Sequence, residues 1–146
     1  MYGPRQGKLR PRRITHLKLP RIGAHMYISN QISPEKMTFL TANYGLTPEQ
    51  IVAFAEGFNS AYSSMAGEIE YSWEEGGWYP DDPESAMIEC LLDADRLEYY
   101  IPDYMDWCFN FRHKTELLYD LRGERPPEWC LPHLEREGKS YWLAAK

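Results

Sequence analysis

The feature that most constrains this chain is a helix-start signal that occurs three times. In each copy a residue with a short polar side chain stands directly before a proline: Ser33-Pro34, Thr47-Pro48 and Asp82-Pro83. Such a side chain accepts a hydrogen bond from a backbone N–H of the first helical turn, and proline suits the first helical position because it has no N–H. Gln50, three residues after Thr47, completes a capping box. The sequence therefore predicts helices that begin at residues 34, 48 and 83.

Apolar residues recur at helical spacing after each of these starts. The second helix carries the widest stripe, formed by Ile51, Phe54, Ala55, Phe58, Ala61, Tyr62 and Met65. A fourth helix is predicted to follow Pro102 and to end at Arg122, before Gly123. We expect five large residues of these stripes to be buried together: Phe54, Phe58, Leu91, Trp107 and Phe111. The predicted fold is mainly α, with about four helices and a helical-hairpin core.

The first two helices also have the order of a helix-turn-helix DNA reader, in which the second helix contacts the bases. In this chain the second helix has no Lys, Arg or His, and its polar side includes Glu49 and Glu56. Binding to DNA requires cations that neutralise phosphates. We therefore interpret the pair as a helical hairpin that packs into the core.

Residues 68–74 change the pattern from helical spacing to alternation. Apolar and polar residues take turns there, with Ile69, Tyr71 and Trp73 on one side, as is typical of a half-buried strand. Gly67 is expected to end the second helix, and Gly76-Gly77 to turn the chain toward a return strand at 78–79. Together with a short strand at 26–32, these segments would form at most a small β-ribbon. A long acidic loop is the alternative.

The first 33 residues hold seven bases and no acid. The bases are Arg5, Lys8, Arg10, Arg12, Arg13, Lys18 and Arg21. Because the whole chain has a net charge of −6, the remainder carries −13. Prolines and glycines interrupt residues 1–25, so we expect a basic, disordered-like N-terminal arm that contacts nucleic-acid phosphates or an acidic protein surface. Residues 26–146 are expected to form a single, mainly helical, acidic domain.

Acidic residues concentrate in residues 68–106, which hold thirteen Asp and Glu and one base, Arg96. Like charges at this density repel one another and lower stability. One interpretation is a surface that keeps the protein in solution. The other is a face that binds a basic partner, which the interleaved aromatic residues favour because Tyr and Trp anchor interfaces. The predicted partner-binding residues are Glu70, Tyr71, Trp73, Glu74, Glu75, Trp78, Tyr79, Asp81, Glu89 and Asp93.

Motifs for catalysis or cofactor binding are not found in the sequence. It has no Glu-x-x-His pair, no phosphate-binding glycine loop and no dinucleotide fingerprint. Cys130 and His133 have the spacing of zinc ligands, and Cys108 with His113 would complete the set. Residues five apart on a helix point about 140° away from each other, so the second pair diverges. We expect no enzyme activity, no cofactor and no metal, and leave open whether Cys130 and His133 bind one.

The cysteine content and the lack of long apolar runs indicate the cellular compartment. Its three cysteines, an odd number, suit a reducing cytoplasm better than a disulfide scaffold. No apolar run approaches the ~20 residues that cross a bilayer, so we expect no membrane partner. We therefore predict a cytoplasmic interaction or regulatory protein whose residues 68–106 dock on a basic protein surface, as a nucleic-acid mimic or inhibitor would. The alternative is an assembly subunit that its basic arm anchors to nucleic acid or to an acidic neighbouring protein.

Overall fold

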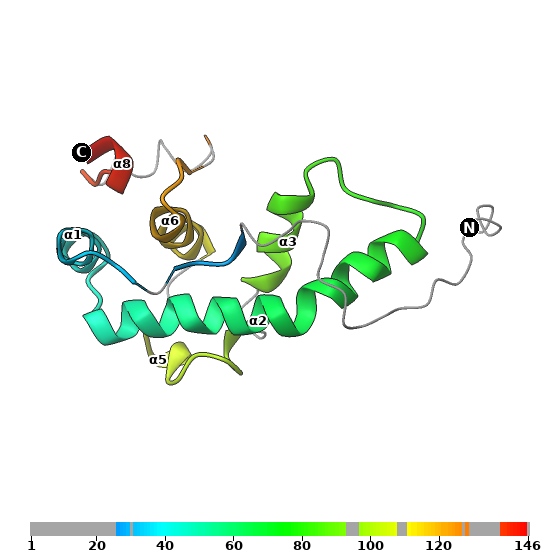
Figure 1. Cartoon of the computed structure of the whole chain (residues 1–146), viewed down its shortest axis with the longest axis horizontal. Coiled ribbons are helices and arrows are strands. Elements are labelled where there is room, and N and C mark those ends of the chain that lie inside the picture. The colour runs from blue at the N-terminus through cyan, green and yellow to red at the C-terminus, as the bar shows by residue number, and fades with distance from the viewer. Residues whose placement is uncertain are drawn as a thin grey trace.

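The computed structural model describes residues 26–29, 31–92, 97–107, 111–126, 128 and 138–145. Its helices are α1 (Pro34–Tyr44), α2 (Pro48–Glu75), α3 (Pro83–Leu91), α5 (Tyr104–Trp107), α6 (Phe111–Arg122) and α8 (Trp142–Ala145), as drawn in Figure 1. No β-strand occurs in the described ranges. The mainly α prediction is confirmed, whereas the basic arm, residues 1–25, lies outside the described residues.

All three predicted helix starts are present with their capping hydrogen bonds. The Ser33 hydroxyl oxygen accepts from the Lys36 N–H at 3.1 Å, and the Asp82 carboxylate accepts from the Ser85 N–H at 3.2 Å. Thr47 and Gln50 bond reciprocally at 3.0 and 3.1 Å, which is the predicted capping box. Each proline occupies the first helical position, so these short sequence signals set the helix starts.

Two helix ends also follow the sequence. Gly45 has a φ of 67° and donates its N–H to the Thr41 carbonyl, which ends α1. Gly123 has a φ of 74° and donates to the Asp120 carbonyl at 3.1 Å just after α6. Glycine suits both positions because a left-handed conformation costs it little.

The predicted strand at 68–74 is wrong, and so is the alternative loop, because α2 continues to Glu75. Gly67 lies inside the helix rather than at its end. The helical face continues through this region, since Tyr62, Ala66 and Trp73 are buried at helical spacing. Within seven residues an alternating pattern also satisfies part of a helical period, and the longer face decides between them. The strands expected at 26–32 and 78–79 are likewise absent from the described residues there.

Figure 1 shows how the other helices surround α2, the longest element. α1 and α6 are viewed nearly end-on and lie side by side, so both cross α2 steeply. α3 packs against α2 on the same side, α5 lies on the opposite side, and α8 contacts α1. The last turns of α2 project beyond the other described helices. The acidic end of α2 is therefore set apart from the body.

The core contains most of the residues predicted for it. Phe54, Phe58 and Leu91 are fully buried, and Trp107 is partly buried against them. The side chain of Phe111 lies outside the described set. Among the described helices, none combines the length and the apolar character that a membrane crossing requires.

Candidate functional site

The last turns of α2 carry four glutamates in different environments. Glu68 and Glu75 are exposed, Glu74 is half-buried and Glu70 is buried, at 5% exposure. Residues seven apart return to the same side of a helix, so Glu68 and Glu75 lie along one edge. The half-buried Tyr71 lies between them on that side. This edge therefore presents two carboxylates with an aromatic residue between them.

Aromatic contacts fold the segment after α2 back onto the helix. The Trp73 ring meets the rings of Trp78 and Tyr79 edge-to-face, with centroid distances of 6.3 and 5.6 Å. The backbone N–H of Trp78 donates to the Trp73 carbonyl at 3.0 Å, directly after Gly77, whose φ of 77° makes the turn. Trp73 is buried, whereas Trp78 keeps 60% of its surface exposed. These contacts hold an exposed indole in a defined position.

Glu70 supports this arrangement from inside. Its carboxylate accepts a hydrogen bond from the Tyr79 hydroxyl, which ties the folded-back segment to the helix. Glu70 and Trp73 therefore form the inner side of the surface rather than its exposed part. Of the ten predicted partner-binding residues, those exposed are Glu75, Trp78, Asp81 and Glu89, and those half-buried are Tyr71, Glu74 and Tyr79. Asp93 lies outside the described residues.

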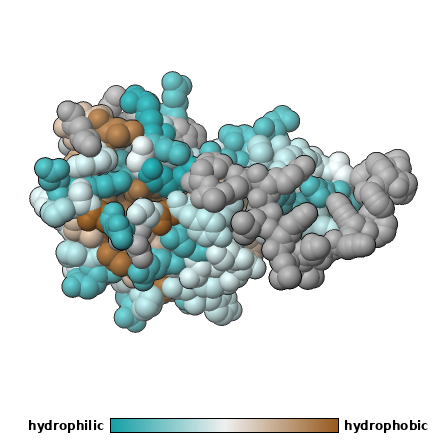
Figure 2. Space-filling model, viewed as in Figure 1, coloured by the Kyte–Doolittle hydropathy of each residue, from teal (hydrophilic) through white to brown (hydrophobic). Residues whose placement is uncertain are grey.

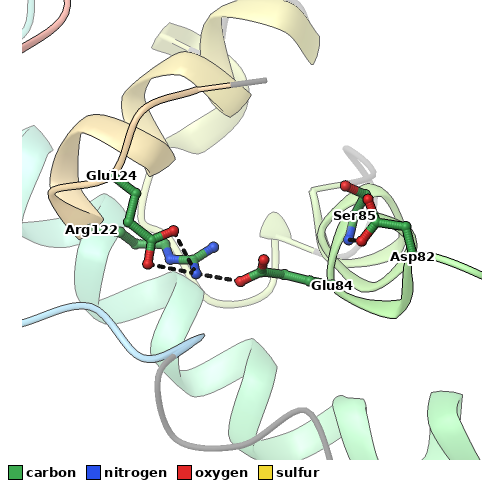
Figure 3. Close-up of polar contacts among 5 residues, drawn as sticks. All are labelled: Asp82, Glu84, Ser85, Arg122 and Glu124. Carbon is green, nitrogen blue, oxygen red and sulfur yellow. Dashed lines mark hydrogen bonds and ion pairs between the residues drawn. The ribbon is translucent and has the colours of Figure 1, made fainter. Parts of the chain in front are cut away.

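An ion pair joins α3 to α6 (Figure 3). Arg122, whose side chain is 1% exposed, donates to Glu84 and also lies 3.0 Å from Glu124. Its guanidinium carbon lies 5.2 Å from the centroid of the Tyr119 ring. Asp82, at the start of α3, caps that helix through its bond with Ser85. The start of α3 is thus fastened to the body, and this fixes the segment that carries Trp78.

Acids in residues 68–106 do not share one side of the molecule. Glu98 and Asp106 are exposed near α5, beside Tyr99 at 86% exposure, and Figure 1 places α5 across α2 from α3. Figure 2 shows hydrophilic residues along the edge where α3 and its preceding loop lie. We call the side that carries the folded-back segment the Trp78 surface. Its members are the exposed or half-buried acidic and aromatic residues of that segment within three positions of Trp78 in the chain: Glu75, Trp78, Tyr79 and Asp81.

The seven bases of the arm lie outside the described residues, but the point where the described chain begins is well defined. Asn59 pairs with both backbone groups of Ile28, at 2.7 and 2.8 Å. The Tyr27 hydroxyl bonds Ser63 at 2.9 Å, four residues further along α2. Ile28 thus contacts α2 at Asn59, and Tyr27, the preceding residue, contacts it at Ser63, which is closer to the acidic end of α2. Going back along the chain, the first described residues therefore lead toward that end.

The sequence analysis missed a group of buried polar residues on α6: Lys114, Thr115, Glu116 and Asp120. The Lys114 ammonium donates to the Leu92 carbonyl at 3.0 Å. Asp120 accepts hydrogen bonds from two other elements. Little in the sequence signals this burial, because Leu117, Leu118 and Leu121 fall on one stripe about 100° wide and Glu116 and Asp120 lie outside it.

The residues with the spacing of zinc ligands lie mostly outside the described residues. Cys108, Cys130 and His133 fall there, and His113 is half-buried on α6. In the part of the chain that is described, no three His, Cys, Asp or Glu side chains come together as metal ligands would. The question of metal at Cys130 and His133 therefore stays open.

Comparison with known proteins adds no assignment. The chain matches no protein-family model, and no curated protein or solved structure is significantly similar to it. A functional conclusion therefore rests on residues of the chain itself.

Proposed function

We propose that this protein is a non-enzymatic interaction protein whose Trp78 surface docks on a basic protein partner. The observation that carries the proposal is an exposed tryptophan held in place among carboxylates. Trp78 is 60% exposed and packs on the buried ring of Trp73. The exposed acids Glu75 and Asp81 stand three residues before and after it. An aromatic anchor with charged neighbours is the usual composition of a binding hot spot and its rim.

The indole supplies affinity. A tryptophan side chain buries roughly 200 Å² at most, so covering the exposed part of Trp78 removes about 120 Å² from water. At about 25 cal/mol per Å², this burial contributes roughly 3 kcal/mol to binding. Because the buried Trp73 already positions the ring, little side-chain entropy is lost when a partner covers it.

The carboxylates supply attraction at a distance. The sequence contains no Lys, Arg or His between Lys36 and Arg96, so the residues of the Trp78 surface themselves contribute a field of one sign. Such a field steers a basic partner and raises its association rate by about tenfold or more. Salt weakens this steering, since the screening length is about 8 Å at physiological ionic strength.

A nucleic-acid-binding protein is a suitable class of partner. Its basic surface is built to bind phosphates, which give a duplex one negative charge per ~1.7 Å of its axis when both strands are counted. Carboxylates at Glu75 and Asp81 would compete for the same cations, and Trp78 would add contact that a phosphate backbone lacks. In that case the protein acts as an inhibitor that mimics nucleic acid.

The test uses two charge reversals of the same size at different places on the protein. The protein is first used to co-purify its partner from native lysate treated with nuclease, at low and high salt. The Glu75→Lys/Asp81→Lys variant is then compared with Glu98→Lys/Asp106→Lys, which makes the same charge change near α5. The first pair should lower the association rate about tenfold, and the second should leave it nearly unchanged. Equal effects of both pairs, or none, would refute the proposal.

Truncation of the anchor tests the aromatic part separately. Trp78→Ala should raise the dissociation rate by about 30-fold, equivalent to roughly 2 kcal/mol, because a hot-spot side chain is lost. The control is Tyr99→Ala, which removes a still more exposed ring, at 86% exposure, in the turn before α5. An unchanged dissociation rate for Trp78→Ala would refute the role of Trp78 in binding and indicate that the acidic surface only keeps the protein in solution.

A second candidate function is an assembly subunit anchored by residues 1–25. It is favoured by the seven bases without an acid in residues 1–33. Binding to nucleic acid through this arm would be sensitive to nuclease and lost on its removal. Binding that resists nuclease but weakens with salt would favour the Trp78 surface instead.

A further inference from the structure

The C-terminal segment, residues 138–145, is held against α1 by an aromatic and a polar contact. The Trp142 ring meets the Phe39 ring edge-to-face, with centroids 5.4 Å apart. The Asn43 side-chain amide donates to the Ser140 carbonyl at 2.6 Å. Tyr141, between these two residues, is buried. The segment is therefore seated on the body rather than trailing from it.

One buried carboxylate joins this segment to two helices. Asp120 of α6 is 1% exposed. One of its oxygens accepts from the Trp142 backbone N–H at 2.9 Å, and the other accepts from the Tyr44 hydroxyl of α1, also at 2.9 Å. Asp120 is thus the point at which α6, α1 and the C-terminal segment meet.

We propose that Asp120 is a proton-controlled latch: the C-terminal segment closes firmly on α1 and α6 when Asp120 is neutral, and loosens when Asp120 ionises. The inference does not depend on the Trp78 surface. A neutral Asp120 can donate its proton to the Tyr44 oxygen while its other oxygen still accepts from Trp142, so both hydrogen bonds survive protonation. An ionised Asp120 keeps both bonds as well, but its charge is then buried away from water. Opening the segment returns that charge to solvent.

The titration of Asp120 falls in the range that such a latch needs. Burial raises the pKa of Asp120 from 3.8 to about 6, against the opposing effects of the Trp142 N–H, the Tyr44 hydroxyl and Lys36. Burial, then the nearby Asp120, also raise the pKa of Tyr44, so its hydroxyl stays protonated and available as a donor. The other titratable groups around the pair are Glu116 on α6, and Tyr141 and Lys139 on the C-terminal segment.

The sign of the effect follows from these values. Because the pKa is higher in the closed state than in water, protonation favours closing, and the latch weakens as pH rises through about 6. If opening returns the pKa to its ordinary value of 3.8, closing is weaker at high pH than at low pH by up to about a hundredfold.

The experiment measures amide hydrogen exchange of the C-terminal segment between pH 5 and 8, corrected for the intrinsic exchange rate. The reporters are Trp142, whose N–H bonds Asp120, and Ala145, whose N–H bonds the Tyr141 carbonyl at 2.9 Å. Their protection should fall by about tenfold as pH rises from 5 to 8, while amides of α2 stay protected. Asp120→Asn keeps the acceptor but cannot ionise, so its protection should not depend on pH. The proposal fails if the full-length wild-type protein shows constant protection, or if the variant keeps the wild-type pH dependence.

A second variant covers the case in which Asp120→Asn disturbs the fold. Tyr44→Phe removes a donor that lowers the pKa of Asp120, so it should move the midpoint of the transition upward from about pH 6. An unchanged midpoint would show that Asp120 does not control the segment. A shift of the midpoint downward would contradict the geometry as well.

Discussion

Adding a single methyl group at Gly57 should change the unfolding free energy in two opposite ways, through helix propensity and through core packing. In an exposed helix Gly→Ala stabilises by roughly 0.5–1 kcal/mol, because alanine loses less backbone entropy. Gly57 lies in the middle of α2 and is buried. A Cβ atom built there would overlap the Ile101 side chain and come within 3.0 Å of the Tyr100 carbonyl oxygen. Ile101 is itself 2% exposed and cannot move out of the way freely.

The packing cost should exceed the propensity gain. Forcing an extra methyl group into a filled core costs about 1–3 kcal/mol, so the net effect of Gly57→Ala should be a loss of about 1–2 kcal/mol. Gly67→Ala is the matched control, since Gly67 lies in the same helix but is exposed. It should gain about 0.5–1 kcal/mol. The two variants should thus move the unfolding free energy in opposite directions.

Urea unfolding, followed by circular dichroism, measures both changes in unfolding free energy. In thermal unfolding, each kcal/mol should shift the melting temperature by about 4 °C. The double variant Gly57→Ala/Ile101→Ala provides a second check. Because Ile101→Ala removes the atoms that collide, the combined loss should be smaller than the sum of the single losses. If Gly57→Ala stabilises the protein as much as Gly67→Ala does, the close approach of the Ile101 segment to α2 is refuted.

Three further predictions concern the core, the latch and the arm. Phe58→Ala should lower the unfolding free energy by about 3–5 kcal/mol, since the ring is fully buried and stacks on Tyr62; a loss under about 1 kcal/mol would contradict this. Asp120→Asn should be more stable than wild type by an amount that grows from pH 5 to pH 8 and reaches at most about 3 kcal/mol, because the raised pKa of Asp120 stabilises the wild-type fold only below about pH 6. Denaturation at several pH values would measure this difference in unfolding free energy, and a difference that does not change with pH would contradict the prediction. Deletion of residues 1–25 should leave the melting temperature nearly unchanged while it removes any binding to nucleic acid; a collapse of thermal stability would place the arm in the core.

The sequence predicts helix starts well because each start depends on residues that are adjacent in the chain. Ser33, Thr47 and Asp82 cap as expected, since the cap and its N–H partner are three residues apart. The end of α2 was harder to predict. Gly67 resembles a helix stop, but tertiary packing of Ala66 and Trp73 keeps the helix going for two more turns. A glycine costs about 1 kcal/mol in a helix, which two buried residues readily offset.

Burial of individual polar residues depends on contacts that a linear pattern does not contain. Asp120 meets Tyr44, which lies 76 residues away in the chain, and Glu70 meets Tyr79 only because the segment after α2 folds back. The sequence showed where acids are abundant but not on which side of α2 they lie. Had residues 68–74 formed a strand, alternate residues would have shared a face. In the helix, residues three, four and seven apart do so instead, which gives the acidic region a different surface.

Some acids near the Trp78 surface make hydrogen bonds or ion pairs that stabilise the fold, and others do not. Glu70 holds Tyr79, Asp82 caps α3, and Glu84 pairs with Arg122. Neutralising any of these should lower stability, because a hydrogen-bonded or buried group loses its partner. Glu75 and Asp81 are exposed, and no hydrogen bond or ion pair ties them to another described residue. Repulsion among these charges makes them a cost to the isolated protein. A role in binding would explain why they stand beside an exposed tryptophan, and it predicts that their removal raises stability while it weakens binding.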